Sequence, residues 1–431
     1  MDILFINPQT ELEDKSKIFH REPPNGLLIL SAILENAGFD VDFLDLSVNK
    51  PTELKSYLIE EPKIVGITSL TNTYHLAMRL LKQVKNISPN SIILYGGPHA
   101  TFKYAEVLQE NRNVDFVLCG EADETILEFM QVQVGKESEK NYSKVPNLAF
   151  RDNGSIRCSK SYAPANLDDL PLPARHLLNL RDYQVGTVIV NRGCPFNCIF
   201  CVRQKIFQKV RYRSTRDVSY EMQVLSRLGF KFVNLYDNIN IDEDYALRLC
   251  QEIEDANINL NWGCELRADK LSLRLARALN KAGCKVIAVG VESGDLEVLE
   301  RANKKQDLKQ VKKGIKAAKS EGISVQVYFV VGLPGETEES FFKTRKLLDE
   351  LALEPGIDTV NFFAATPYPG TPLYEHPEQF GVRIRHEDWD LYDNSHLLME
   401  LDSIEFEQLE KNFGRGREIE KTFTPLSERK M

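Results

Sequence analysis

Short apolar runs alternate with longer amphipathic stretches along the first 132 residues of the chain. The runs predict strands, and the amphipathic stretches, whose apolar positions recur every three or four residues, predict helices. The expected strands are 3–6, 41–46, 64–68, 92–95 and 114–118, and the expected helices are 27–37, 52–59, 73–84 and 125–132. Because strands that are buried on both faces and joined by helices form parallel sheets, we expect a Rossmann-like or flavodoxin-like α/β domain over residues 1–132.

A hairpin and a linker are expected over residues 133–184. Residues 147–158 alternate in polarity around Asn153-Gly154, a dipeptide that is typical of two-residue hairpin turns. Proline ends helices and central strands, and prolines follow at positions 164, 171 and 173. We therefore place the boundary between two domains in this stretch.

The alternation resumes at residue 185 with a period of about 35 residues. The expected strands are 187–190, 232–236, 260–265, 286–291, 325–331 and 359–364, with helices near 217–228, 243–256, 272–282, 307–320 and 338–352. Six such units predict a partial (β/α)6 TIM-like barrel over residues 185–372, and barrel enzymes carry their chemistry on the loops after the strands. Residues 373–431 show no clear period, and we expect them to form a capping segment and a tail.

Composition narrows the class of partner. The chain has 431 residues and a formal net charge of -9, and its lysines are scattered, which argues against nucleic acid as a partner. Its first residues lack the pattern of a secretory leader, and no run of about 18 apolar residues occurs. We expect a soluble cytoplasmic protein that does not contact a membrane.

Three cysteines follow the first strand of the second series at CxxxCxxC spacing: Cys194, Cys198 and Cys201. Such a set can bind three irons of a [4Fe-4S] cluster and leave the fourth iron open for a ligand. A zinc site and three buried thiols are the alternatives. Zinc requires a fourth protein ligand, and no His or Cys follows before Cys250. The spacing therefore favours the cluster.

The loops after the later strands extend this motif to a family resemblance. They contain Tyr236-Asp237-Asn238, Cys264 to Asp269, Gly290 to Gly294, Gly332 to Thr337 and Thr366 to Pro372. Together with the cysteines, these loops resemble those of the radical SAM superfamily. The resemblance implies that the open iron binds S-adenosylmethionine (SAM), and that one electron from the cluster cleaves SAM to a 5′-deoxyadenosyl radical.

The same resemblance implies which residues contact SAM: Phe200, Asp237, Glu265, Arg267, Glu292 and Gly332. Ordinary structural roles stay open for several of them. A core position is the alternative for Phe200, and Glu265 and Arg267, two positions apart on a strand, can form a structural ion pair. The segment after Gly332 can simply start a helix.

Glycine-rich loops follow several strands of the first series, and glycine lets a ligand approach the backbone closely. No GxGxxG opens the first helix, which disfavours a dinucleotide. With Pro23 to Leu27 and Val65 to Thr68, these loops resemble the cobalamin-binding domain that precedes many radical SAM enzymes. The resemblance implies cobalamin contacts at Ser69, Gly96, Gly97, His99, Gly120 and Glu121. Ordinary turn chemistry is the alternative for any single loop.

The chain departs from other cobalamin proteins in one respect. It has no Asp-x-His-x-x-Gly loop, which supplies the histidine beneath the cobalt in many of them. Members of the cobalamin-dependent radical SAM group often lack this loop too. The resemblance therefore implies a cobalt with no such histidine beneath it.

The resemblance as a whole implies a cobalamin-dependent radical SAM enzyme, similar to the class B methylases, that methylates an unactivated carbon or a phosphorus of a small metabolite. Radical ring closure, ring contraction or oxidation without methyl transfer is the first alternative. A tRNA methylthiotransferase and a non-catalytic iron-sulfur protein are further alternatives. The family chemistry implies an external electron donor such as flavodoxin or ferredoxin as a partner.

Overall fold

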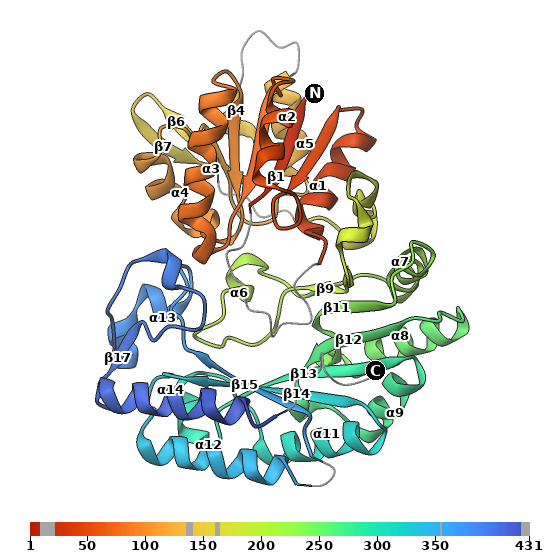
Figure 1. Cartoon of the computed structure of the whole chain (residues 1–431), viewed down its shortest axis with the longest axis vertical. Coiled ribbons are helices and arrows are strands. Elements are labelled where there is room, and N and C mark those ends of the chain that lie inside the picture. The colour runs from red at the N-terminus through yellow and green to blue at the C-terminus, as the bar shows by residue number, and fades with distance from the viewer. Residues whose placement is uncertain (9–21, 135–140, 160–163, 354–355, 424–431) are drawn as a thin grey trace. The chain divides into compact units, whose positions relative to one another are not determined.

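The computed structural model describes residues 1–8, 22–134, 141–159, 164–353 and 356–423. The chain divides into two compact units (Figure 1). The first comprises Met1–Glu13 and Pro23–Tyr183, and the second comprises Asp14–Glu22 and Gln184–Met431.

A parallel sheet forms the centre of the first unit. Its parallel strands are β1 (Ile3–Asn7), β2 (Val41–Asp45), β3 (Ile64–Thr68), β4 (Ile92–Gly96) and β5 (Phe116–Leu118). The helices are α1 (Asn25–Asn36), α2 (Leu54–Leu58), α3 (Tyr74–Ile87), α4 (Pro98–Glu110) and α5 (Thr125–Val134). The order β2-β1-β3-β4-β5 is that of the flavodoxin-like fold, which confirms the expected fold class.

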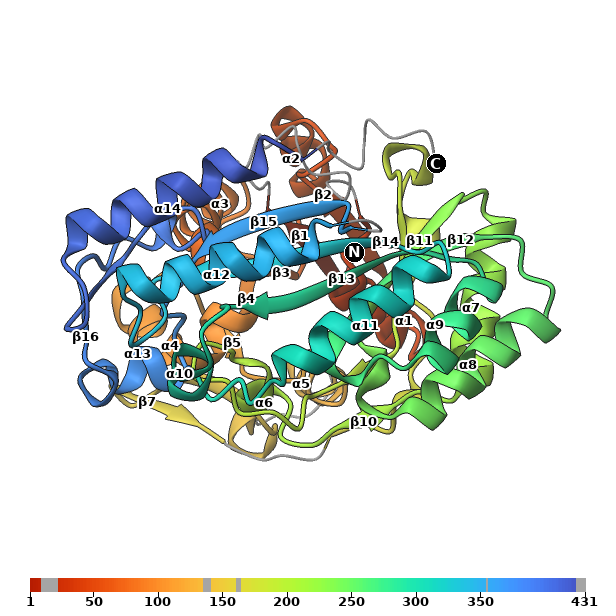
Figure 2. The same cartoon turned by 90° about the horizontal axis from the view of Figure 1, so that it is seen from below.

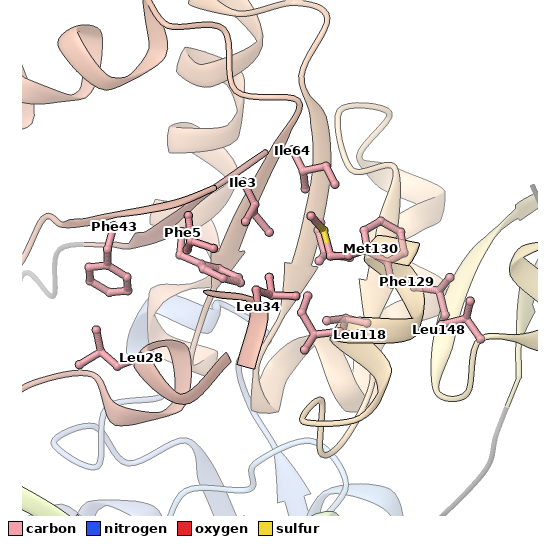
Figure 3. Close-up of a cluster of buried hydrophobic side chains, with 14 of the residues drawn as sticks. Ile3, Phe5, Leu28, Leu34, Phe43, Ile64, Leu118, Phe129, Met130 and Leu148 are labelled. Atoms are coloured by element: carbon pink, nitrogen blue, oxygen red, sulfur yellow. The ribbon is translucent and has the colours of Figure 1, made fainter. Parts of the chain in front are cut away.

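The core of this unit packs the sheet against helices (Figure 3). Ile3 and Phe5 from β1 lie in one cluster with Leu28 and Leu34 from α1, and all four are at most 2% exposed. Phe5 also requires a glycine on the neighbouring strand, because a Cβ on Gly66 would lie 2.6 Å from its ring. Burial of this apolar surface is the main stabilising contribution.

Two features of the first unit differ from the sequence expectation. Helix α4 was not expected, because Gly97-Pro98 reads as a loop; proline is in fact well suited to the first turn of a helix. The hairpin of β6 (Leu148–Asp152) and β7 (Ser155–Cys158) pairs antiparallel with β5, so it extends the first sheet instead of forming part of a linker. Its turn holds Asn153 and Gly154 at positive φ, as expected.

The segment after the hairpin also packs on the first unit. The Ala174 amide donates to the Leu28 carbonyl at 3.0 Å. The Tyr183 hydroxyl donates at 2.7 Å to Asp45 Oδ2, at the end of β2. The segment therefore contacts α1 and β2 of the first unit as far as Tyr183, the last residue of that unit.

Six parallel strands form the sheet of the second unit: β8 (Gly186–Ile189), β11 (Phe232–Asn238), β12 (Asn261–Leu266), β13 (Cys284–Glu292), β14 (Ser324–Val331) and β15 (Thr359–Ala364). The intervening helices lie along its outer side (Figure 2): α7 (Thr215–Arg227), α8 (Glu243–Asp255), α9 (Leu273–Lys281), α11 (Leu308–Ser320) and α12 (Glu338–Leu351). This arrangement confirms the partial barrel. Among the described residues, no pairing joins β8 to β15.

Smaller elements complete the second unit. They are β9 (Asn191–Arg192), α6 (Arg203–Ile206), β10 (Arg211–Tyr212), α10 (Leu296–Arg301), α13 (Pro372–Glu375), β16 (Val382–Ile384), β17 (Met399–Leu401) and α14 (Phe406–Glu420). Helix α14 packs on the edge strand β15, where a Cβ on Gly416 would lie 2.7 Å from the Phe362 ring. The Glu420 carboxylate accepts the Phe362 amide. No helix in the described ranges is long and apolar enough to cross a membrane.

Candidate active site

The three motif cysteines lie in one loop that follows β8 and β9 and ends at α6. All three are free thiols; Cys194 and Cys198 are half-buried and Cys201 is exposed. The Cys201 amide donates to the Cys198 carbonyl at 3.1 Å, which folds the CxxC part into a turn. The loop therefore presents three thiols at the carboxyl end of a barrel strand, where barrel enzymes place their chemistry.

The segment after α10 holds this loop in place. Asn303 Nδ2 donates to the Asn197 carbonyl at 2.7 Å, and the Ile199 amide donates to the Ala302 carbonyl at 3.1 Å. The Ile199 carbonyl in turn accepts the Leu373 amide at 3.1 Å. These contacts join the cysteine loop to residues more than 100 positions away, so no local sequence pattern predicts them.

Arg267, expected to contact SAM, lies directly beside the cysteine loop. Its guanidinium carbon is 3.9 Å from the centre of the Phe196 ring, between the first two motif cysteines. Nε and Nη2 donate to the Asp269 carboxylate at 3.0 and 2.8 Å. Nη1 and Nη2 also donate to the carbonyls of Lys304 and Lys305, at 3.3 and 3.1 Å. The guanidinium thus joins three segments of the barrel mouth.

Glu292 ends β13 in a left-handed conformation, with φ of 67°, which is rare for a non-glycine residue. Its carboxylate accepts Lys304 Nζ at 2.6 Å. Both side chains are buried, at about 10% exposure, so each charge requires the other. Sequence reasoning found Glu292 but missed Lys304, because Lys304 lies outside the motif loops.

Burial disfavours the ionised form of one motif thiol. Burial raises the pKa of the Cys198 thiol to about 11, and the nearby Lys304 ammonium acts in the opposite direction. A protonated, partly buried thiol is a poor nucleophile, whereas a coordinating thiol is deprotonated by the metal. Three unpaired thiols on one pinned loop therefore suit a three-cysteine iron-sulfur site.

The loop after β14 begins at Gly332, whose φ is 92°. Its amide donates to Glu336 Oε2 at 2.7 Å, which closes a short turn before α12. Burial raises the pKa of Glu336 to about 7, and the hydrogen bond from the Gly332 amide acts in the opposite direction. The Glu336 carboxylate therefore stabilises the loop through the Gly332 amide, and Gly332 directly follows the carboxyl end of β14.

The inner face of the sheet carries polar side chains together with larger aromatic ones, such as Tyr328, whose ring centre is 5.4 Å from that of Phe363. Glu265 on β12 shares this face with its register neighbours Ala288 and Gln326. Gln326 Nε2 donates to Asn361 Oδ1 at 2.7 Å. Desolvation raises the pKa of Glu265, and the nearby Glu292 carboxylate acts in the same direction. This polar face suits a ligand with hydrogen-bonding groups.

The expected SAM residues thus follow four neighbouring strands and the cysteine loop. Asp237 lies in β11, Glu265 in β12, and Glu292 ends β13. Phe200 is half-buried in the cysteine loop. Their placement at one end of the sheet is consistent with a shared ligand, and their contacts with SAM remain predictions.

In the first unit, the expected cobalamin residues follow β3, β4 and β5. Gly97 has φ of 102°, and a Cβ there would lie 2.5 Å from the Ser69 carbonyl oxygen. Only glycine therefore allows the two loops to approach this closely. The Gly120 amide donates to Thr101 Oγ1 at 2.9 Å. The loops of Ser69, Gly96, Gly97, Gly120 and Glu121 follow the carboxyl ends of three adjacent strands, where open α/β sheets bind ligands.

His99 lies in the first turn of α4 and is 2% exposed. Its ring centre is 4.5 Å from that of Tyr74. Burial and the nearby Lys103 lower the pKa of His99 to about 4, so the imidazole is neutral at physiological pH. It is packed within the unit, and its contact with cobalamin remains a prediction.

Comparisons with known proteins agree with this geometry. Residues 188–348 match the radical SAM superfamily and residues 16–130 match the B12 binding domain. An uncharacterized methyltransferase of Pyrococcus horikoshii is 29% identical over 95% of this chain and 90% of its own. An anaerobic magnesium-protoporphyrin IX monomethyl ester cyclase of Rubrivivax gelatinosus is 26% identical over 94% of this chain and 74% of its own.

A solved structure shares the fold of both units. It is that of TsrM, a radical S-adenosylmethionine methyltransferase from Kitasatospora setae with cobalamin and a [4Fe-4S] cluster bound. It has a TM-score of 0.78 and 17% identity, and the match covers 96% of this chain and 90% of that one.

Proposed function

We propose that this chain, which belongs to the cobalamin-binding radical SAM enzymes, methylates an unactivated carbon or a phosphorus of a small-molecule substrate. The observation that carries the proposal is the loop of Cys194, Cys198 and Cys201, pinned at the carboxyl end of a barrel strand in a chain that also has a B12 binding domain. The methyltransferase of Pyrococcus horikoshii, similar along nearly the whole chain, supports methyl transfer.

The cofactors are a [4Fe-4S] cluster, SAM and cobalamin. When bound, they supply a 5′-deoxyadenosyl radical and a transferable methyl group, so the protein contributes position and exclusion of water. Cys194, Cys198 and Cys201 hold the cluster. Phe200, Asp237, Glu265, Arg267, Glu292 and Gly332 are the proposed SAM contacts, and Ser69, Gly96, Gly97, His99, Gly120 and Glu121 are the proposed cobalamin contacts.

Two roles within this set follow from the contacts. Arg267 orients the cysteine loop through Phe196 and leaves few N–H groups for a ligand. Glu265 has its carboxylate on the polar inner face, where it can accept hydrogen bonds from SAM or substrate. The substrate is proposed to lie on this same face.

A second candidate is a radical ring closure without methyl transfer. It is favoured by the similarity to the cyclase of Rubrivivax gelatinosus. The ratio of products separates the two: methylation yields S-adenosylhomocysteine and 5′-deoxyadenosine in about equal amounts, whereas a cyclisation yields turnover without S-adenosylhomocysteine.

We further propose that a cytoplasmic flavodoxin or ferredoxin supplies the electron. The test of the function is anaerobic purification with cluster reconstitution, followed by measurement of iron, cobalt and SAM cleavage under dithionite. We expect iron and cobalt in the wild type, and loss of SAM cleavage with retained cobalt in Cys198→Ala. Iron without cobalt, after cobalamin has been supplied, would contradict the role of the first unit.

A further inference from the structure

The charge of the cysteine region differs from that of the whole chain. The protein has 63 acidic and 54 basic residues, yet residues 192–216 contain no Asp or Glu. The basic residues in this stretch are Arg192, Arg203, Lys205, Lys209, Arg211, Arg213 and Arg216. A cationic stretch in an acidic protein, containing all three cluster cysteines, requires an explanation.

The fold brings these charges to the cysteines. Strands β9 and β10 pair antiparallel, with Arg192 opposite Arg211, and so close residues 193–210 into one loop. Lys209 lies across from the start of the motif, since a Cβ on Gly193 would be 2.5 Å from the Lys209 carbonyl oxygen. Helix α6, which carries Lys205, begins two residues after Cys201. We call residues 192–216 the basic loop.

Part of the basic loop is available to a partner. Arg213 is committed to an ion pair with the buried Glu221. Lys205, Lys209 and Arg216 are exposed. These three form no ion pair with the residues that the structure describes. Among the described residues, the charges of Lys205, Lys209 and Arg216 therefore have no ion-pair partner, and they belong to the same loop as the exposed Cys201.

We propose that the basic loop is the docking surface for an acidic one-electron carrier protein of the flavodoxin type, an inference that rests on the proposed function. In the transfer, the reduced carrier loses one electron and the cluster gains it, and no bond forms or breaks. Charge complementarity steers such encounters and raises their association rate, with an interface that is small and weak enough for release. Because the basic side chains lie in the same loop as the three cysteines, electrostatic attraction brings the carrier protein close to the cluster that accepts the electron.

A nucleic acid fits this surface less well. The formal net charge of -9 repels a long polyanion, whereas a compact acidic protein needs only one local cationic patch. Lys205 and Lys209 are also exposed, whereas residues that bind a small substrate are expected on the inner face of the sheet. The basic loop is therefore an external surface of the barrel unit.

The experiment measures cluster reduction in the reconstituted holoenzyme by a reduced flavodoxin, followed as the loss of cluster absorbance under anaerobic conditions. Lys205→Glu/Lys209→Glu is compared with Lys313→Glu/Lys316→Glu, which changes the net charge equally on exposed positions of α11. We expect the first pair to slow reduction by roughly tenfold or more at low salt and the control pair to leave it within about twofold. High salt should remove the difference, because ions screen exposed charges.

The proposal would be overturned if flavodoxin reduced the cluster of both double variants at the same rate. It would also be overturned if the rate of cluster reduction in the wild type did not depend on salt concentration. Iron per chain is measured first; if the glutamate pair loses its cluster, Lys205→Gln/Lys209→Gln replaces it, with a smaller slowing expected. Reduction by dithionite, a small molecule, should be alike in all variants. SAM cleavage with dithionite as the reductant tests the proposed function separately. If flavodoxin reduces the wild-type cluster but SAM is not cleaved, the result contradicts the proposed function and leaves the docking surface supported.

Discussion

Replacement of Arg267 by methionine should destabilise the barrel unit and impair cluster loading. Methionine keeps much of the volume but removes every donor to Asp269 and to the carbonyls of Lys304 and Lys305. The side chains of Arg267 and Asp269 are 6% and 8% exposed, so the carboxylate is left buried without its counter-ion. Breaking one partner of such a pair costs about 3–5 kcal/mol.

Part of that loss falls on the cysteine loop. A cation at 3.9 Å over the Phe196 ring contributes about 1–2 kcal/mol when it is desolvated. Loss of this contact releases the loop at a residue between Cys194 and Cys198. We therefore expect Arg267→Met to retain less iron after reconstitution, beyond its effect on unfolding.

The assay is anaerobic urea unfolding followed by tryptophan fluorescence, together with iron per chain. Both tryptophans, Trp262 and Trp389, lie in the barrel unit, so the signal reports on that unit. Arg274→Met, at an exposed position of α9, is the control. The reasoning would be refuted if Arg267→Met had the stability and iron content of the wild type. The double variant Arg267→Met/Asp269→Asn leaves neither charge of this pair buried and unpaired, so it should recover part of the lost unfolding free energy; recovery of none would also refute the reasoning.

Three further predictions concern Lys304, Glu336 and Gly97. Lys304→Met leaves the Glu292 carboxylate buried and unpaired, so the midpoint of barrel unfolding should fall strongly, whereas Lys305→Met, one residue away and exposed, should leave it nearly unchanged. Burial raises the pKa of Glu336 from 4.5 to about 7, so the folded state stays protonated while the unfolded state ionises between these values; its contribution to stability is full below pH 4.5 and falls by about 3 kcal/mol as pH rises to 7. Glu336→Gln should abolish that fall, so urea unfolding should show the variant gaining on the wild type from pH 5 to pH 8; a constant difference would contradict the assigned pKa. Gly97→Ala places a Cβ 2.5 Å from a carbonyl oxygen, so cobalt retained after cobalamin reconstitution should drop while iron content does not, and equal losses of both metals would contradict a local effect.

The sequence predicted the features that depend on local pattern. Buried strands appear as continuous apolar runs, so the two sheets were readable from the sequence. The cysteine spacing predicts its ligand chemistry within eight residues, and the cluster at this loop stays a prediction. Helix α4 was not, because Gly97-Pro98 has the same composition in a turn and at a helix start. The dipeptide alone does not distinguish a turn from a helix start, whereas the packing of the residues that follow it does.

Features that depend on distant contacts were not readable either. Arg267 resembled a ligand residue, and its stacking on Phe196 depends on how two strand-end loops meet. Lys304 carried no motif, and its pairing with Glu292 follows from the left-handed turn that ends β13. Sequence spacing predicts which loops form the site, whereas the roles within it depend on side-chain contacts that the spacing does not show.

The contact between Tyr183 and Asp45 bears on how the protein can be divided into fragments. Asp45 is 1% exposed and receives the Tyr183 hydroxyl together with donors from Asn7 and Ser47. A fragment that stopped at residue 132, where the periodic pattern ends, would lack both this hydroxyl and the hairpin that covers the edge of β5. A fragment that ran through Tyr183 would keep both, because the compact unit ends about fifty residues after the end of its family match.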